Sequence, residues 1–167
     1  MTRLRNTVVV VALAAVLIAA GLTIRAKERI LADGRIVLLE LAPVDPRSLI
    51  QGDYMALRYA PKVLPATTGE SELPMNGAAV LGLGAGGVAV YRRLDRGEPM
   101  ATDEVRLRYR SLLPNGDVRY GAESFFFEEG AASAYELARF GVLKVDAQGN
   151  SVLVGLADAE GRLIQPE

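Results

Sequence analysis

Two carboxylates, a guanidinium and two phenols lie close together in the sequence. They belong to Asp45, Asp53, Arg47, Tyr54 and Tyr59. Paired carboxylates can exchange protons with a substrate or hold a hard cation. The same residue types also build turns, because aspartate accepts hydrogen bonds from nearby backbone N–H groups and arginine pairs with aspartate. The sequence favours the structural role, and the alternative is a surface that contacts a ligand or partner.

A hydrolytic site is a second interpretation of the same part of the chain. Ser48 would be the nucleophile and Lys62 or Lys144 its base, since a buried lysine with a lowered pKa can accept the proton. However, Ser48 is followed by Leu-Ile, whereas serine–lysine signal peptidases have a Ser-Met-x-Pro pattern. Lys62 also follows a proline in a segment that is typical of a turn. The pattern therefore argues against this chemistry.

The composition excludes several other kinds of site. The 167 residues include 19 basic and 20 acidic residues and no His, Cys or Trp. Zinc and haem sites usually need His or Cys, and a Ser-His-Asp triad needs His, so we expect no metal site and no cofactor. Nucleic-acid recognition needs a clustered basic surface, and the near-neutral charge argues against a nucleic-acid partner.

Two further patterns have both a functional and a structural interpretation. Residues 82–87 are glycine-rich, but no helix and no P-loop lysine follow them, so we interpret them as a loop or a glycine-rich strand. Arg106, Arg108 and Arg110 alternate with other residues and would share one face of a strand. These arginines could meet phosphate or an acidic partner. We prefer the interpretation that they protect an exposed strand from edge-to-edge pairing.

The segment 52–59 reads GDYMALRY, which occupies every fixed position of a known motif. On this motif the chain resembles the bacterial GDYXXLXY-motif proteins. The preceding residues 43–49 and the later residues 126–130 also fit that family's pattern. The resemblance implies a small bacterial protein with an N-terminal membrane segment, and it implies no particular biochemical activity.

The motif also has a physical interpretation of its own. Gly52 can adopt a positive φ at the entry to a strand, and Asp53 can cap the turn. Tyr54 and Tyr59 have opposite parity along a strand, so one is expected in the core and the other outside. The candidate binding surface comprises Asp45, Arg47, Gly52, Asp53, Tyr54, Leu57 and Tyr59.

Residues 7–24 form an uncharged, mostly apolar segment. As a helix it would be about 27 Å long, close to the roughly 30 Å thickness of the hydrocarbon core of a bilayer. We expect it to cross the membrane and to contact lipid through residues 7–24. The segment is longer than the apolar part of a typical cleaved signal, so we favour an uncleaved anchor, although Ala19-Ala20-Gly21 would suit cleavage.

Residues 25–33 are charged and helix-forming, and they predict a continuation of the helix that ends at Gly34. Basic residues flank the apolar segment on both sides, but a short basic N-terminus usually stays in the cytoplasm. We therefore expect residues 1–33 to form a cytoplasmic tip, an anchor and its helical continuation. Residues 34–167 would form a periplasmic domain at a bacterial inner membrane. Residues 31–167 hold 14 basic and 19 acidic residues, a net charge of −5, so this part should stand off an anionic bilayer.

Short apolar runs separated by turn residues predict a mainly β domain. We expect strands at 35–41, 54–59, 87–94, 104–112, 117–120, 123–127, 142–145 and 151–156. One short helix should begin near residue 131 and end at Gly141, Asn115-Gly116 should form a hairpin turn, and residues 78–86 would be at most a weakly specified strand. Because the strands recur without interleaved helices, the expected fold is a small antiparallel barrel or sandwich after one transmembrane helix.

These observations predict a membrane-anchored accessory or interaction domain without catalytic activity. A polytopic membrane protein would suit it as a partner. The alternative is a membrane-tethered hydrolase or ligand-binding enzyme that uses Asp45, Asp53 and a tyrosine of the motif.

Overall fold

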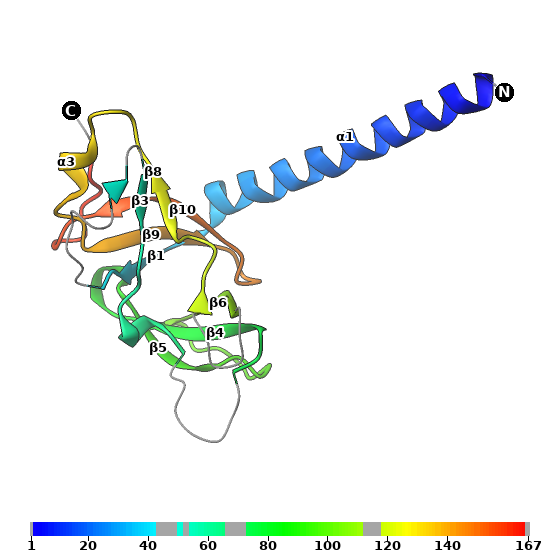
Figure 1. The fold of residues 1–167 in the computed structure, drawn as a ribbon. Helices are drawn as coiled ribbons and strands as arrows, with labels where there is room; N and C mark the ends of the chain where they lie inside the picture. The colour runs from blue at the N-terminus through cyan, green and yellow to red at the C-terminus, as the bar shows by residue number, and fades with distance from the viewer. Residues whose placement is uncertain (1, 43–49, 52–53, 66–72, 112–117, 166–167) are drawn as a thin grey trace.

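A long helix extends away from a β domain in the computed structural model, which describes residues 2–42, 50–51, 54–65, 73–111 and 118–165 (Figure 1). The helix, α1 (Thr2–Asp33), ends where the sequence predicts, and the backbone N–H of Gly34 donates to the carbonyl of Ile30 at 2.9 Å. Within the described residues, Asn6–Asp33 is the one stretch that is long and apolar enough to span a membrane. None of its most apolar window is buried in the protein, so α1 does not act as the core helix of the β domain.

The β domain consists of three antiparallel sheets. The first, called the β1 sheet here, has the order β1 (Arg35–Glu40), β9 (Phe140–Val145) and β10 (Ser151–Ala157). The β3 sheet has the order β2 (Ile50–Gln51), β3 (Tyr54–Ala56) and β8 (Ser124–Phe126). The β4 sheet has the order β5 (Ala89–Leu94), β4 (Asn76–Leu83), β6 (Glu104–Ser111) and β7 (Val118–Arg119). Short helical turns are η1 (Pro61–Val63), η2 (Ala85–Gly87) and α3 (Ala132–Tyr135).

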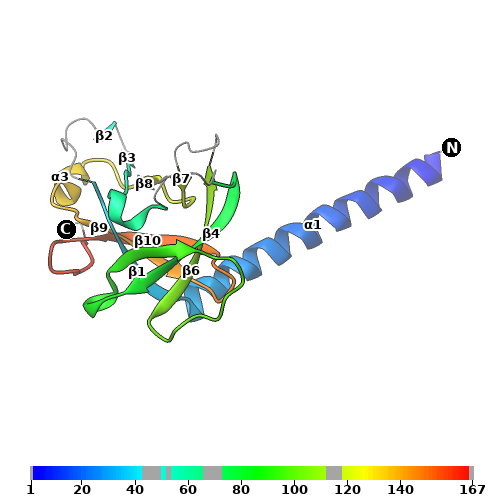
Figure 2. The same cartoon turned by 90° about the horizontal axis from the view of Figure 1, so that it is seen from below.

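The main core lies between the β1 sheet and the β4 sheet, where Leu39, Leu81, Leu107 and Leu143 are fully buried. A smaller cluster joins the β3 sheet, α3 and β10. In Figure 1 the β4 sheet lies below the β1 sheet and α3 above it, and Figure 2 shows α1 meeting the domain beside the β9–β10 hairpin. The mainly β, antiparallel fold class is confirmed. The described strands do not close into a barrel, so the packed-sheet alternative holds.

Strand β6 follows the predicted alternation closely. Val105, Leu107, Tyr109 and Ser111 are buried, whereas the arginines between them are exposed or half-buried. The preferred explanation for those arginines is wrong, because β6 is not an edge strand. Strand β4 pairs along its length, β7 pairs at one end, and the backbone N–H of Arg108 donates to the carbonyl of Gly149 at 2.9 Å.

The segment 76–83 differs most from its prediction. It forms β4, which pairs with both β5 and β6 and therefore lies inside its sheet. Ala79, Val80 and Leu81 are fully buried there. Small residues suit this strand because large neighbours cover it. A Cβ at Gly77 would lie 2.6 Å from the hydroxyl of Tyr109.

Two other predictions need correction. The helix expected from residue 131 to Gly141 is only the four residues of α3, because Gly141 belongs to β9 and pairs with Leu39. The aromatic run 125–127 is only partly core. Phe125 and Phe127 pack against the smaller cluster, but Phe126 is 73% exposed because neighbouring strand residues point to opposite faces.

Candidate functional site

The motif tyrosines divide between core and surface as their parity predicts. Tyr59 is buried in the main core and Leu57 in the smaller cluster, whereas Tyr54 is half-buried. The ring of Tyr54 lies 5.8 Å from that of the exposed Phe126 on β8. The other candidate residues of this surface lie outside the described residues, and they are Asp45, Arg47, Gly52 and Asp53.

Tyr59 has a clear structural role. Its hydroxyl donates to the carbonyl of Ala122 at 2.5 Å, and its ring meets that of Tyr120 edge to face at 5.9 Å. The hydroxyl of Tyr120 in turn donates to the carbonyl of Val63 at 2.5 Å. Burial raises the pKa of both phenols well above their ordinary value, and the charge of Glu123 adds to the effect on Tyr59. These neutral phenols fix the backbone of residues 120–122 against the segment that follows the motif.

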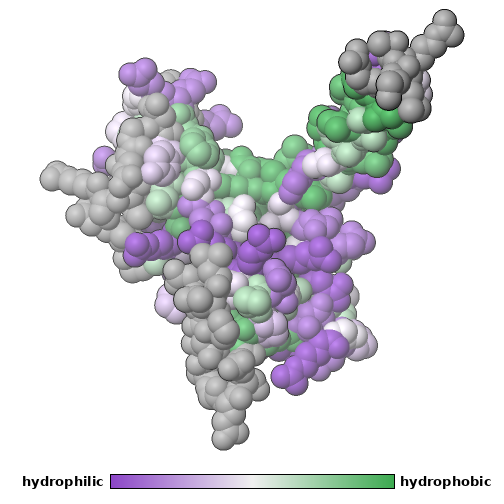
Figure 3. All heavy atoms as spheres, turned by 45° about the vertical axis from the view of Figure 1, so that its right-hand side comes forward, coloured by the Kyte–Doolittle hydropathy of each residue, from purple (hydrophilic) through white to green (hydrophobic). Residues whose placement is uncertain are grey.

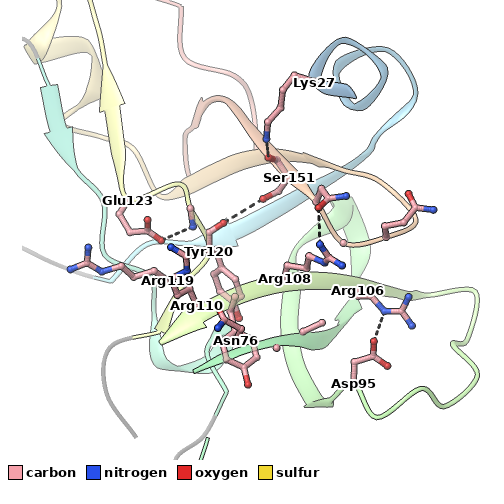
Figure 4. Close-up of a pocket in the computed structure, with 17 residues that line it drawn as sticks. Lys27, Asn76, Asp95, Arg106, Arg108, Arg110, Arg119, Tyr120, Glu123 and Ser151 are labelled. Carbon is pink, nitrogen blue, oxygen red and sulfur yellow. Dashed lines mark hydrogen bonds and ion pairs between the residues drawn. The ribbon is translucent and has the colours of Figure 1, made fainter. Parts of the chain in front are cut away.

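A groove of about 1120 Å³ opens beside this fixed segment. Its walls come from β4, β6, β7, the segments after β5 and β7, the β9–β10 hairpin and the end of α1 (Figure 4). The groove's basic side chains are Lys27, Arg106, Arg108, Arg110 and Arg119. Its acidic side chains are Asp95 and Glu123. The groove is therefore locally basic, although the part of the chain after residue 30 carries a net charge of −5.

Both groove carboxylates already have partners. Asp95 forms an ion pair with Arg106 and accepts a hydrogen bond from the N–H of Gly97 at 3.0 Å. The Gly97 hydrogen bond, followed by the charge of Arg106, lowers the pKa of Asp95 below its ordinary value. Glu123 accepts from the N–H of Gly121 at 3.0 Å. Neither acid forms an ion pair with Arg108, Arg110 or Arg119.

Arg110 and Arg119 face each other directly, because β6 and β7 pair these two positions. Figure 4 shows the two side chains on one side of the groove, near Glu123. Arg108 lies on the same strand face, and its guanidinium donates to the side-chain carbonyl of Asn150 at 3.4 Å. In the described part of the chain no carboxylate forms an ion pair with any of these three arginines. Like charges opposite each other on neighbouring strands are destabilising, and a bound anion would remove this repulsion.

The end of α1 forms the upper rim of the groove. The ammonium group of Lys27 donates to the carbonyl of Ser151 at 3.3 Å, and Ile30 is only 4% exposed. Lys144 on β9 donates to the carbonyl of Leu31. In Figure 3 the apolar surface gathers on α1, and hydrophilic residues cover much of the β domain below it. The helix is thus joined to the β domain at the rim of the groove.

A comparison with models of known protein families finds a match for this chain. The model of the family described as GDYXXLXY protein matches residues 16–156. The chain belongs to the GDYXXLXY family. No curated protein and no solved structure matches it significantly.

The hydrolytic interpretation gains no support in this GDYXXLXY protein. Lys62 is 48% exposed and forms an ion pair with Glu40, so it is not a buried base. Lys144 binds the end of α1, and Ser48 lies outside the described residues. Among the described residues, no three His, Cys, Asp or Glu side chains come together as a metal site.

The sequence placed three arginines of this GDYXXLXY protein on one face but missed the groove that they line. Arg119 joins them through the pairing of β6 with β7, and that register depends on a turn whose residues, 112–117, lie outside the description. The antiparallel return that the hairpin predicted is confirmed. Lys27 is one of the basic residues that flank the apolar segment, and the sequence alone predicts no further role for it. The sequence features that could have indicated a basic groove are the basic residues after the apolar segment and the alternating arginines.

Proposed function

We propose that this GDYXXLXY protein is a membrane-anchored interaction domain without catalytic activity. Residues 1–33 would form the cytoplasmic tip and the anchor, and residues 34–167 a periplasmic β domain at a bacterial inner membrane. The observation that carries this proposal is the joint between α1 and the β domain. Lys27 and Ile30 hold the helix end against the domain, so a basic groove lies where the anchor leaves the bilayer.

The chemistry of the groove supports binding rather than catalysis. Its acids are occupied by Arg106 and by backbone N–H groups, and of its two phenols Tyr120 donates to a buried carbonyl while burial raises the pKa of Tyr109. Catalysis of proton transfer needs a group whose pKa lies near the working pH, whereas burial raises the pKa of Tyr120 and the neighbours of Asp95 lower that of Asp95. Arginine is permanently charged and suits recognition of anions.

Photo-crosslinking from native membranes tests this function. A photoreactive residue at Gln148, on the exposed hairpin tip that lines the groove, should capture the same integral-membrane partner reproducibly. The matched control places it at Glu160, an exposed residue outside the groove lining, and should capture none. Equal capture from both positions, or a bare monomer from both, would contradict the proposal.

The proposed anchoring and side are tested separately. The natural chain has no Cys, so Gln148→Cys gives a single thiol in the groove. An impermeant maleimide should label it from the periplasmic side of intact inner membranes. Labelling that requires opening the cytoplasmic side would contradict the orientation. A mature chain that begins near residue 22 by intact mass would contradict the uncleaved anchor.

A further inference from the structure

Three of the four groove arginines, Arg108, Arg110 and Arg119, form no ion pair with a carboxylate in the described part of the protein. Arg110 and Arg119 oppose each other across β6 and β7, and Arg108 has only a neutral amide partner. A guanidinium presents several N–H donors in one plane and binds phosphate oxygens in pairs. Two guanidinium groups carried by paired positions of neighbouring strands therefore suit a phosphate group better than an isolated carboxylate, because phosphate offers oxygens to both.

The position of the groove relative to α1 indicates where such a phosphate would come from. Lys27 lines the groove and follows the last residue of the uncharged segment, Ile24, by three residues. At 1.5 Å per residue its Cα lies about 4.5 Å beyond the segment along the helix axis. The headgroup layer on each side of a bilayer is roughly 5–7 Å thick. The rim of the groove thus reaches the headgroups when α1 spans the membrane.

We infer that the groove binds the phosphate of an anionic phospholipid headgroup in the membrane that anchors the chain. The inference rests on the proposed membrane anchoring. Arg110 and Arg119 hold the phosphate between them, and Arg108 and Lys27 add positive charge from the two sides. The remainder of the domain is acidic and is repelled by the same surface. The groove is therefore a local contact that fixes how the domain stands on the bilayer.

The test uses the full chain with Gln148→Cys, labelled with an environment-sensitive fluorophore, in nanodiscs of phosphatidylcholine with increasing phosphatidylglycerol. The emission should change with the anionic lipid and reach a plateau. In the Arg110→Gln/Arg119→Gln variant the fraction of phosphatidylglycerol needed should rise on the order of tenfold or more, because each basic residue near an anionic surface contributes measurably to attraction. The matched control, Arg96→Gln/Arg139→Gln, removes the same charge from exposed arginines outside the groove lining and should titrate like the parent.

Three outcomes would overturn the inference. These are no response to phosphatidylglycerol, an equal loss in the groove and control variants, and an equal response to inorganic phosphate added to phosphatidylcholine nanodiscs, which would point to a free anion. Retention of the unlabelled chain in washed membranes tests anchoring by itself, so a failure of the proposed function is distinguished from a failure of lipid binding.

Folding of the variants is checked by thermal melting. The Arg110→Gln/Arg119→Gln variant should melt no lower than its parent, because it removes a repulsion. If it melts lower, the single variant Arg119→Gln, at an exposed position of the short strand β7, is titrated instead and should still raise the fraction of phosphatidylglycerol required. An unchanged titration of that variant would contradict the proposal.

Discussion

Two groups of arginines on the β4 sheet are treated differently by the protein. On β5, Arg92 pairs with Asp103, and Arg93 pairs with Glu98 and Glu104. On β6 and β7, Arg110 and Arg119 face each other without a carboxylate partner in the described part of the chain. The arginines of β5 therefore form ion pairs within the protein, whereas Arg110 and Arg119 form none with a described carboxylate, although Asp95 and Glu123 also line the groove. This difference indicates that the groove arginines are kept for an anion from outside the protein.

Tyr59 of the motif links the core to the segment that lines the groove, because its hydroxyl donates to the carbonyl of Ala122. Removing Tyr59 should change the stability of the protein more than any other variant considered. Tyr59→Ala should lower the free energy of unfolding by about 3–5 kcal/mol, because it empties a buried aromatic site. Tyr59→Phe keeps the ring but leaves the carbonyl of Ala122 without its donor, and should cost about 1–3 kcal/mol. Urea unfolding of the full chain in micelles measures both. Equal stability of parent and Tyr59→Ala would show that the motif does not support the groove wall.

Alkaline pH should lower the free energy of unfolding through the same tyrosine. Burial raises the pKa of Tyr59 in the folded state, whereas the unfolded phenol titrates near pH 10. The stability from this difference is complete below about pH 10 and is lost as the pH rises above it, because the unfolded phenol loses its proton first. The loss is about 1.4 kcal/mol per pH unit for each such phenol. Above about pH 10, the free energy of unfolding should fall less steeply with pH in Tyr59→Phe than in the parent, by about that amount. Identical slopes would contradict this account.

The hairpin tip on the groove side should tolerate a methyl group less well than the loop after β5. Gly149 has φ +83°, and an added Cβ would lie 2.9 Å from the Cγ of Arg106. Gly97 has φ +87° with no atom within 4 Å of such a Cβ. Both alanine variants carry backbone strain of about 1–3 kcal/mol, and Gly149→Ala should lose more stability because it also displaces Arg106. Thermal melting compares the two, and a larger loss in Gly97→Ala would be evidence against the packing described.

Neutralising one arginine at a time should give the smallest changes in stability. The change should be a loss for an arginine of β5 and a gain for an arginine of the groove. Arg93→Gln should lower the melting temperature because it breaks ion pairs with Glu98 and Glu104. Arg119→Gln should raise the free energy of unfolding by a few tenths of a kcal/mol, since it removes a cross-strand repulsion. High salt should reduce both differences. The same sign for the two variants would remove the distinction between the two groups of arginines.

The sequence predicted elements whose pattern is strong and local. The uncharged segment gave α1, and the alternation around Arg106, Arg108 and Arg110 gave β6 with its buried and exposed faces. It did not predict β4 as an interior strand, because glycines such as Gly77 and Gly82 become favourable there only once Tyr109 and Arg92 cover them. It also overestimated the helix near residue 135, since pairing of β9 with β1 and β10 outweighed local helix propensity.

The candidate site was predicted only in part. The sequence identified the motif and the arginine face and predicted that one motif tyrosine is buried. It could not show that Tyr59 is the buried one and that Tyr54 reaches the surface. The groove brings together residues from positions 27 to 151, and that arrangement depends on tertiary pairing rather than on local pattern.

Hydrogen–deuterium exchange of the full chain in nanodiscs, with and without phosphatidylglycerol, tests the central claim most directly. The groove account predicts slower exchange at residues 118–123 and 146–151 when the anionic lipid is present, and unchanged exchange along β5. Slower exchange on β5, or no change at the groove segments, would contradict it.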